Sequence, residues 1–184
     1  ETNANGGRSS VIDISKSSAG SFTSEFSFTD FIVWLTAAMR AGAGTTVSGT
    51  TSYTNANVMK SFYFEKQFTD ISALIGAYGM VISEFSLTLT ANEIATATFG
   101  FMGQYLKKES ATRGSTTPTA KATDQVMRSG VDVASLLLGG AASPATCQSL
   151  TLSWTNNVRP KTGLGFGHPP GHNLGTFDVS GNAR

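Results

Sequence analysis

The chain has 184 residues, of which 13 are Lys or Arg and 12 are Asp or Glu, so only 14% are charged, whereas an ordinary surface is roughly a quarter to a third charged. Ser, Thr, Gly and Ala together supply 86 residues, which favours packed strands and close contacts between chains over a fully solvated monomer. The net charge of +1 removes the electrostatic argument for a nucleic-acid-binding protein, which would neutralise phosphates with a basic stripe.

Two strands are predicted before the first helix, at Ser10–Ser15 and Ser21–Phe26. A helix is predicted over Thr29–Arg40, because its apolar residues recur at the spacing of one helical face. These residues are Phe31, Trp34, Leu35, Ala38 and Met39. A helix of three turns cannot bury such a stripe alone, so it is expected to pack on a sheet.

The two ends of this helix carry residues that favour its start and its stop. Thr29 is expected to cap the N-terminus, and Asp30 in the first turn complements the positive end of the helix dipole. Arg40 is expected in the last turn, and Gly42 and Gly44 are expected to end the helix.

Alternating apolar and polar residues predict three strands in the middle of the chain, at Val58–Phe68, Val81–Thr90 and Ile94–Met102. The short link Ala91–Glu93 makes the last two a hairpin. The residues expected on the apolar faces are Phe62, Phe64, Phe68, Val81, Phe85, Leu87, Leu89, Ala95, Ala97, Phe99 and Phe101. The opposite face of the second strand carries Glu84, Ser86, Thr88 and Thr90.

Further strands are expected at Gln148–Trp154 and Gly175–Gly181, which brings the total to about seven. Two long loops, Lys107–Gly130 and Asn156–Leu174, separate these elements. Loops of this length are usually functional or disordered. Both loops would be explained if they are arms that reach a neighbouring subunit.

A short pattern occurs twice in the chain. Ser-Leu-Thr-Leu stands at 86–89 and again at 149–152, and each copy is followed by a Phe-containing strand flanked by glycine. Any strand with outward Thr and inward Leu can have this pattern. The repeat therefore leaves open whether a β unit has been duplicated.

No catalytic, cofactor or metal site can be assembled from the sequence. His168 and His172 are four residues apart, but Pro169–Gly171 between them prevents the helical face that zinc-binding pairs use, and no Cys, Asp or Glu is near. Cys147 is the single cysteine, so an internal disulfide is excluded. It lies in no nucleophile motif and is interpreted as a small buried apolar residue.

Other segments suggest chemistry only superficially. Gly163–His168 lacks the preceding strand, the following helix and the lysine of a phosphate-binding loop, so a flexible arm is expected. The aromatic run Phe62–Phe64 alternates like a core strand rather than a base-stacking platform. Four glutamates are considered as catalytic acids or bases, and no motif pairs them for these roles. The four are Glu65, Glu84, Glu93 and Glu109.

The sequence also indicates the size of the core, the absence of a membrane-spanning helix and the place of this segment in a longer chain. With 40% hydrophobic residues and 12 Phe, the chain can form one core or two small ones. No apolar run approaches the ~20 residues of a membrane-spanning helix, so no membrane insertion is expected. The chain begins with Glu1 rather than Met and ends at Arg184 without a terminating feature, so it is expected to be part of a longer chain.

Several segments together carry a resemblance to a known family. They are Lys60–Asp70 (KSFYFEKQFTD), Gly79–Ser83, Ala97–Gly103, Gly20–Ala38, Asn156–Pro160 and Gly175–Phe177. In these segments, which span most of the chain, it resembles the major tail tube proteins of long-tailed bacteriophages and related prophages. The shared motifs are structural rather than catalytic.

This resemblance implies a mainly β fold, a β-sandwich or barrel tube unit with one packed helix, here at 29–40. It implies a virion protein, made in the cytoplasm of the bacterial host, that assembles with copies of itself into stacked rings forming the hollow phage tail tube. The lumen holds the tape measure protein and later conducts double-stranded DNA without sequence-specific binding. Rings of such proteins contain three two-unit or six one-unit subunits.

The repeat favours the two-unit version. The first tube unit is then expected over residues 1–130, including helix 29–40 and the long loop 106–130, and residues 131–184 supply strands of a second unit that continues beyond the sequence given. The face of Ser86, Thr88 and Thr90 is expected either to line the lumen or to meet the next subunit. Leu87 and Leu89 facing the lumen would contradict this register.

Other classes of protein stay open as alternatives to a tail tube protein. A β-sandwich module that binds a receptor or a carbohydrate would expose aromatic residues, but Trp34 lies on the helix stripe and Trp154 shares its side with Leu150 and Leu152. A distal tail or terminator protein shares the tube fold but forms a single ring. An enzyme is disfavoured, because no acid, base, nucleophile or metal set is found.

Overall fold

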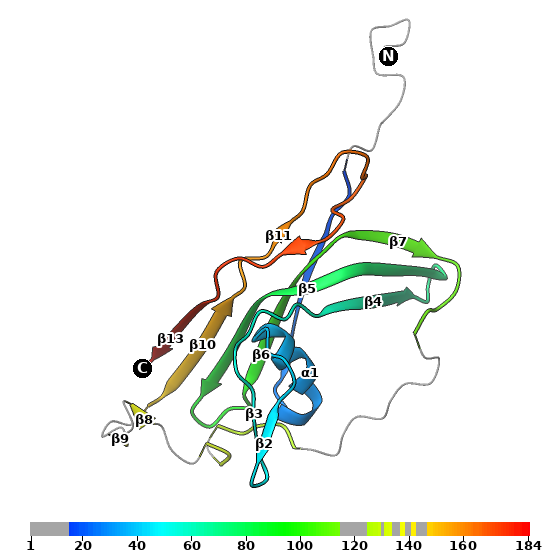
Figure 1. Ribbon diagram of the computed structural model, residues 1–184. Coiled ribbons are helices and arrows are strands. Elements are labelled where there is room, and N and C mark those ends of the chain that lie inside the picture. Colours follow the sequence, from blue (N-terminus) through cyan, green and yellow to red (C-terminus); the bar gives the residue numbers. More distant parts are fainter. Residues whose placement is uncertain (1–14, 115–124, 130, 134–136, 139–140, 143–146) are drawn as a thin grey trace, which may run out of the picture.

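The computed structural model describes residues 15–114, 125–129, 131–133, 137–138, 141–142 and 147–184. Its main feature is one antiparallel sheet of seven strands (Figure 1). The strands are β1 (Ser18–Glu25), β4 (Ser61–Phe68), β5 (Ala73–Thr90), β6 (Thr96–Gly103), β7 (Tyr105–Glu109), β10 (Ser149–Thr155) and β13 (Asp178–Ala183). The mainly β, sandwich-like fold class with one packed helix is confirmed.

Three small two-stranded sheets accompany the main one. They are formed by β2 (Thr45–Val47) with β3 (Thr50–Ser52), β8 (Leu137–Leu138) with β9 (Ala141–Ala142), and β11 (Arg159–Pro160) with β12 (His172–Asn173). The β2–β3 hairpin was not predicted from the sequence. Its turn residues Ser48 and Gly49 both have positive φ, of 49° and 79°, as a type I′ turn requires.

Strand β5 organises the sheet, because it has paired neighbours on both edges along nearly its whole length. Its first half pairs with β4 on one edge and β7 on the other, and its second half pairs with β10 and β6. The first half forms, with β4 and β7, a three-stranded extension, here termed the arm (Figure 1). Gly79, with φ of 62°, lies where the arm joins the remaining sheet.

Helix α1 (Phe28–Ala38) covers one face of the sheet (Figure 1). The Trp34 ring lies at the centre of its contacts, 4.7 Å from the Phe22 ring and 5.4 Å from the rings of Phe64 and Phe101. Aromatic rings prefer such tilted contacts at 4.5–7 Å. The predicted helical stripe is confirmed, since Phe31, Trp34 and Leu35 pack against the buried core.

The predicted ends of this helix are wrong in detail. Ser27, not Thr29, is the N-cap residue, and Thr29 is exposed inside the first turn. Arg40 does not lie in the last turn, because the helix ends at Ala38 with Met39 as its C-cap. Arg40 instead takes a left-handed conformation with φ of 54°, which is unusual for a residue with a long side chain.

The Arg40 side chain is 6% exposed and is held by the segment after β10. Its Nε donates to Asn156 Oδ1 (2.8 Å), and its two terminal nitrogens donate to backbone oxygens of Asn156 (2.5 Å) and Gly175 (2.8 Å). Asn156, 1% exposed, donates from Nδ2 to the carbonyl oxygens of Ala38 (3.0 Å) and Ile82 (2.9 Å). These two side chains therefore join the end of α1 to β5 and to the β10–β13 connection.

A bulge in β5 changes the alternation that the sequence predicted. The register against β6 shifts between Ile82 and Glu84, so that Ile82 and Phe85 both lie in the buried core cluster. Val81 is opposite Met102 and is buried outside that cluster. The prediction that Val81 shares a face with Phe85 is therefore wrong, because a bulge inserts one unpaired residue.

Most other predicted elements are confirmed with small shifts at their ends, but β5 begins at Ala73 rather than at the predicted Val81, so its first half was not predicted. The β5–β6 hairpin, β4, β1, β10 and β13 correspond to predicted strands. Both predicted loops are wrong in part. The first residues of Lys107–Gly130 belong to β7, and β11 and β12 lie within Asn156–Leu174. The predicted strand Ser10–Ser15 lies almost entirely outside the described residues. In the part of the chain that the structure describes, no helix has the length and apolar character needed to cross a bilayer.

We predict that replacing Asn156 with Ala destabilises the fold by about 3 kcal/mol, since Arg40 Nε and the carbonyl oxygens of Ala38 and Ile82 each lose a hydrogen bond at once. Urea unfolding of the unassembled protein measures this change. Asn55→Ala is the matched control, because Asn55 is exposed and donates one bond, to the Met39 carbonyl. Equal free energies of unfolding for the two variants would contradict the role given to Asn156.

Candidate assembly surface

The face of the sheet opposite α1 carries small polar side chains in rows that cross five strands. The register pairs Thr23 with Thr98, Thr98 with Ser86, Ser86 with Ser153, and Ser153 with Ser180. This middle row consists entirely of hydroxyl residues, and the Thr23 and Thr98 hydroxyls are hydrogen-bonded at 2.8 Å. We refer to this face as the hydroxyl face.

Two neighbouring rows complete the hydroxyl face. One contains Ser21, Gly100, Glu84, Thr155 and Asp178. The other contains Glu25, Thr96, Thr88, Thr151 and Asn182. The charged members of the three rows are all acidic. The hydroxyl face thus offers hydrogen-bonding groups and a modest negative charge.

The predicted orientation of the second half of β5 is confirmed. Leu87 and Leu89 pack against the core beneath the sheet, so Ser86 and Thr88 lie on the hydroxyl face. The two copies of the Ser-Leu-Thr-Leu pattern lie on adjacent strands, where Leu87 pairs with Leu152 and Leu89 pairs with Leu150. Both copies therefore occupy the same kind of site, with Leu toward the core and Thr on the hydroxyl face.

The two outer strands of this five-stranded region have one open edge each. The strand order is β1-β6-β5-β10-β13, and no other strand within the described ranges pairs with the outer edge of β1 or β13. All six residues of β13 are exposed. Open edges present unpaired N–H and C=O groups that can pair with another chain. Since each neighbour in the order is antiparallel to the next, β1 and β13 run in the same direction.

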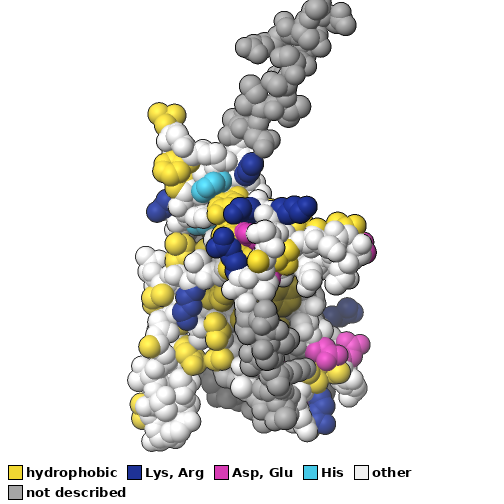
Figure 2. Space-filling view, turned by 90° about the vertical axis from the view of Figure 1, so that its right-hand side faces the viewer, with side chains coloured by type: hydrophobic (Ala, Val, Ile, Leu, Met, Phe, Trp, Pro, Cys, Tyr) yellow, Lys and Arg dark blue, Asp and Glu magenta, His cyan; other side chains and the backbone are white. Residues whose placement is uncertain are grey.

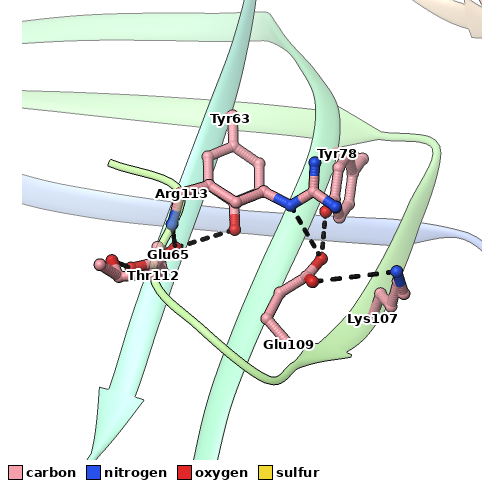
Figure 3. A network of polar contacts seen from close by, with 7 residues as sticks. All are labelled: Tyr63, Glu65, Tyr78, Lys107, Glu109, Thr112 and Arg113. Carbon is pink, nitrogen blue, oxygen red and sulfur yellow. Dashed lines mark hydrogen bonds and ion pairs between the residues drawn. The ribbon is translucent and has the colours of Figure 1, made fainter. Parts of the chain in front are cut away.

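The arm carries a polar network on one face (Figure 3). The Glu65 carboxylate accepts hydrogen bonds from the Tyr63 hydroxyl (3.0 Å), the Arg113 backbone N–H (2.9 Å) and the Thr112 hydroxyl. Glu109 accepts from the Tyr78 hydroxyl. The network binds the segment that follows β7 back onto β4 and β5. These glutamates are scattered in the sequence, and the pairing of β4 and β7 with β5 brings them together.

Ion pairs and rings extend this network. Glu109 lies 3.8 Å from Lys107 Nζ and 3.6 Å from Arg113 Nε. The Tyr78 ring stacks on Tyr105 at 4.7 Å, and the Tyr105 ring lies 4.5 Å from the His168 ring. The arm is therefore attached both to the segment after β7 and to the loop that contains His168.

These contacts shift the pKa values of the groups involved. The hydrogen bond from Tyr78 is the main cause that lowers the pKa of Glu109 below 4.5, and the hydrogen bond from the Arg113 backbone is the main cause that lowers the pKa of Glu65. The same bond to Glu109 raises the pKa of Tyr78 to about 12. Each shift favours the ionised carboxylates and the neutral phenol that the network requires.

The residues considered for chemistry lie apart from one another. His168 contacts Tyr105, whereas His172 is buried in β12, where desolvation lowers its pKa. Cys147 is half-buried, and its thiol donates to the Ser149 carbonyl (3.2 Å). Among the described residues, no three His, Cys, Asp or Glu side chains are grouped to hold a metal. Trp154 stacks on Phe85 at 4.3 Å and packs against the core.

A hydroxyl face that α1 leaves uncovered and two strand edges left unpaired by the described strands are properties of a self-associating structural protein. The family comparison agrees. A family model described as "Phage tail tube protein" matches residues 3–184, and the chain belongs to this family. It is accordingly a structural component of the virion that assembles into a tube with copies of itself. No curated protein matches the chain closely enough to count as a relative.

We predict that the arm loosens at both extremes of pH. The lowered pKa values of Glu65 and Glu109 stabilise the arm above pH 4.5, and this contribution is lost as the pH falls through their native pKa values. The raised pKa of Tyr78 stabilises it below pH 10, and this contribution is lost as the pH rises toward about 12.

Hydrogen exchange of the backbone amides of β4, β7 and the first half of β5, corrected for intrinsic rates, measures this loosening. Glu109→Gln is expected to raise exchange at neutral pH and to weaken its acid dependence. Glu93→Gln, in the exposed turn between β5 and β6, is the control and leaves the arm unchanged. Identical acid dependence in the Glu109→Gln variant would contradict the assignment.

Proposed function

We propose that the chain forms the wall of a phage tail tube whose lumen holds the tape measure protein and later conducts double-stranded DNA. The observation that carries this proposal is the hydroxyl face, which α1 leaves uncovered while it covers the other face of the same sheet. A wall of this kind needs one apolar face turned to its own core and one polar face turned to the passing polymer. The proposed role includes no catalytic step.

The hydroxyl face suits a lumen because of its charge. DNA carries one negative charge per ~1.7 Å of duplex, and proteins retain it with Lys and Arg. The three rows contain Glu25, Glu84 and Asp178 as their charged members. A surface with hydroxyls and a few carboxylates holds water without attracting phosphates. DNA on such a wall is expected to slide rather than to bind.

The open edges suit the closure of a ring. A rotation about a common axis brings β13 of one copy beside β1 of the next, and both strands run in the same direction, so the added pair is parallel. Main-chain hydrogen bonds then continue the sheet from one subunit into the next. A ring of such contacts leaves no edge open.

The subunit number and the division of the chain stay predictions. Three two-unit or six one-unit subunits per ring are both compatible with pairing of β1 and β13. A first unit at 1–130 and a second starting at 131 also stay a prediction, as does synthesis in the host cytoplasm. We propose that the lumen wall contacts the tape measure protein without specific recognition, as it contacts DNA.

We predict that the complete protein, when concentrated, forms long hollow tubes visible by negative-stain electron microscopy. Averaged end views give the rotational symmetry, and hence the number of subunits in a ring. Single rings that never elongate would instead indicate a terminator or distal tail protein. Stable monomers under all conditions would contradict the proposed function.

We predict that lysines on the hydroxyl face slow DNA passage without preventing assembly. Thr98→Lys combined with Ser153→Lys adds two positive charges to the middle row, and each would hold a phosphate that the native wall releases. Ejection from virions assembled with this variant, followed by dye entry into released DNA, is expected to slow and to recover at high salt. Thr54→Lys, on an exposed loop outside the sheet, is the control. Unchanged ejection would place the hydroxyl face outside the lumen.

A further inference from the structure

The turn at Gly163–Gly167 exposes two large apolar side chains at one end of the molecule. Leu164 is fully exposed, and Phe166 is 57% exposed. Gly165 at its centre has φ of 85°. Figure 2 shows hydrophobic side chains protruding at this upper end, beside a histidine. We refer to residues 163–167 as the apolar turn.

The apolar turn has a fixed base. Its last residue, Gly167, accepts a backbone hydrogen bond from Lys16 (2.9 Å), and Lys161 donates to Gly171 (2.9 Å) below it. The next residue, His168, contacts Tyr105 on the arm, and Pro169 is buried. Two exposed apolar side chains on an anchored turn favour a binding role over a loose connection.

A pocket at the opposite end of the sheet has the matching chemistry. It has a volume of about 240 Å³ and lies between the β5–β6 turn and the start of β10. Its lining combines the apolar residues Leu89, Ala91, Val133, Cys147 and Leu150 with the polar residues Thr90, Asn92, Ser129, Gln148 and Ser149. An apolar cavity of roughly 150 Å³ accommodates benzene, so this pocket has room for the ring of Phe166.

The turn and the pocket cannot meet within one chain. The apolar turn is bonded to Lys16 just before β1, and the first residue of β1 pairs with Gly103 at the far end of β6. The pocket is lined by Asn92 in the turn that precedes β6. The two sites are thus separated by the length of β6, eight residues, or roughly 25 Å at the rise of a strand.

The charges near the two ends also differ. Lys16, Arg159 and Lys161 lie near the apolar turn. Glu25 and Glu93 lie at the pocket end, together with the Arg128–Asp132 ion pair (3.5 Å). Arg184 also lies there, so the contrast is modest. The positive end of one copy still faces the more acidic end of another when they stack.

We infer that the apolar turn of one copy inserts into the pocket of a copy in the next ring, so that rings stack head to tail. This inference rests on the proposed tube function. A knob and a pocket at different places on one chain make a contact that does not close, and repetition of such a contact generates a filament. Strand edges then close each ring, and the apolar turn joins successive rings.

The double variant Leu164→Ser with Phe166→Ser tests the contact. Both side chains are exposed, so the melting temperature of the monomer stays unchanged, while the protein concentration needed for tubes rises roughly tenfold or more. Val47→Ser removes a similarly exposed apolar side chain from the β2–β3 hairpin and is the control. Tube formation at the wild-type concentration in the double variant would overturn the inference.

A disulfide gives a direct geometric test. Phe166→Cys is expected to bond to the native Cys147 of another copy in oxidised tubes, because Cys147 lines the pocket and disulfides need Cα atoms within about 7 Å. Non-reducing gels should show a ladder that continues past the number of subunits in one ring. Adding Cys147→Ser should remove the ladder. Tubes of the single variant without any cross-link would overturn the contact.

The two proposals fail differently. If the wild-type protein forms tubes and neither the serine nor the cysteine variant behaves as described, the apolar turn is not the stacking contact and the tube function stands. If the wild-type protein forms no tubes, the proposed function itself fails.

Discussion

The packing of this protein depends on one buried cation. Arg40 carries its charge into the interior, and no carboxylate of the described residues is bonded to it. The oxygens that surround it come from the Asn156 side chain and from backbone carbonyls of residues 156, 175 and 176. Desolvation lowers the pKa of Arg40, and the nearby charge of Asp178 acts against this shift. Such an arrangement is stable only if all of these oxygens stay in place.

The consequence is a fixed position for α1. Because Arg40 lies just beyond the helix and Asn156 bonds to both Ala38 and Ile82, the helix cannot slide along the sheet without breaking these bonds. The aromatic cluster around Trp34 then fills the space beneath it. Much of one face of the sheet is thus used by the core, whereas the hydroxyl face and the outer strand edges are available to other molecules.

The sequence was informative where periodicity is regular. The stripe of Phe31, Trp34 and Leu35 predicted the helix, and the alternation from Phe85 to Leu89 predicted a strand with a polar outer face. Each depends on residues close together in the chain. The β5 bulge was not predicted, because two apolar residues followed by two polar ones at Val81–Glu84 interrupt the alternation without showing which residue is unpaired until the partner strand is known. The same applies to Arg40, which has the spacing of a last-turn residue but takes a left-handed conformation.

The polar groups of the arm show a second limit of local patterns. Glu65 and Glu109 are distant in sequence, and their shared network exists because β4 and β7 flank the same half of β5. The turn around Phe166 was recognised as glycine-rich, and its fixed base comes from Lys16, far away in the chain. Contacts of this kind are set by topology, which short motifs do not encode.

The difference between the two ends of the sheet has a consequence for any stack of these subunits. One terminus of the stack exposes protruding apolar groups, and the other exposes hollows, so the stack has a direction. Growth at the two termini therefore requires different incoming surfaces. In the stack proposed above, a protein that stops elongation meets a different surface at each terminus, and the polarity of the tube follows from the asymmetry of a single polypeptide.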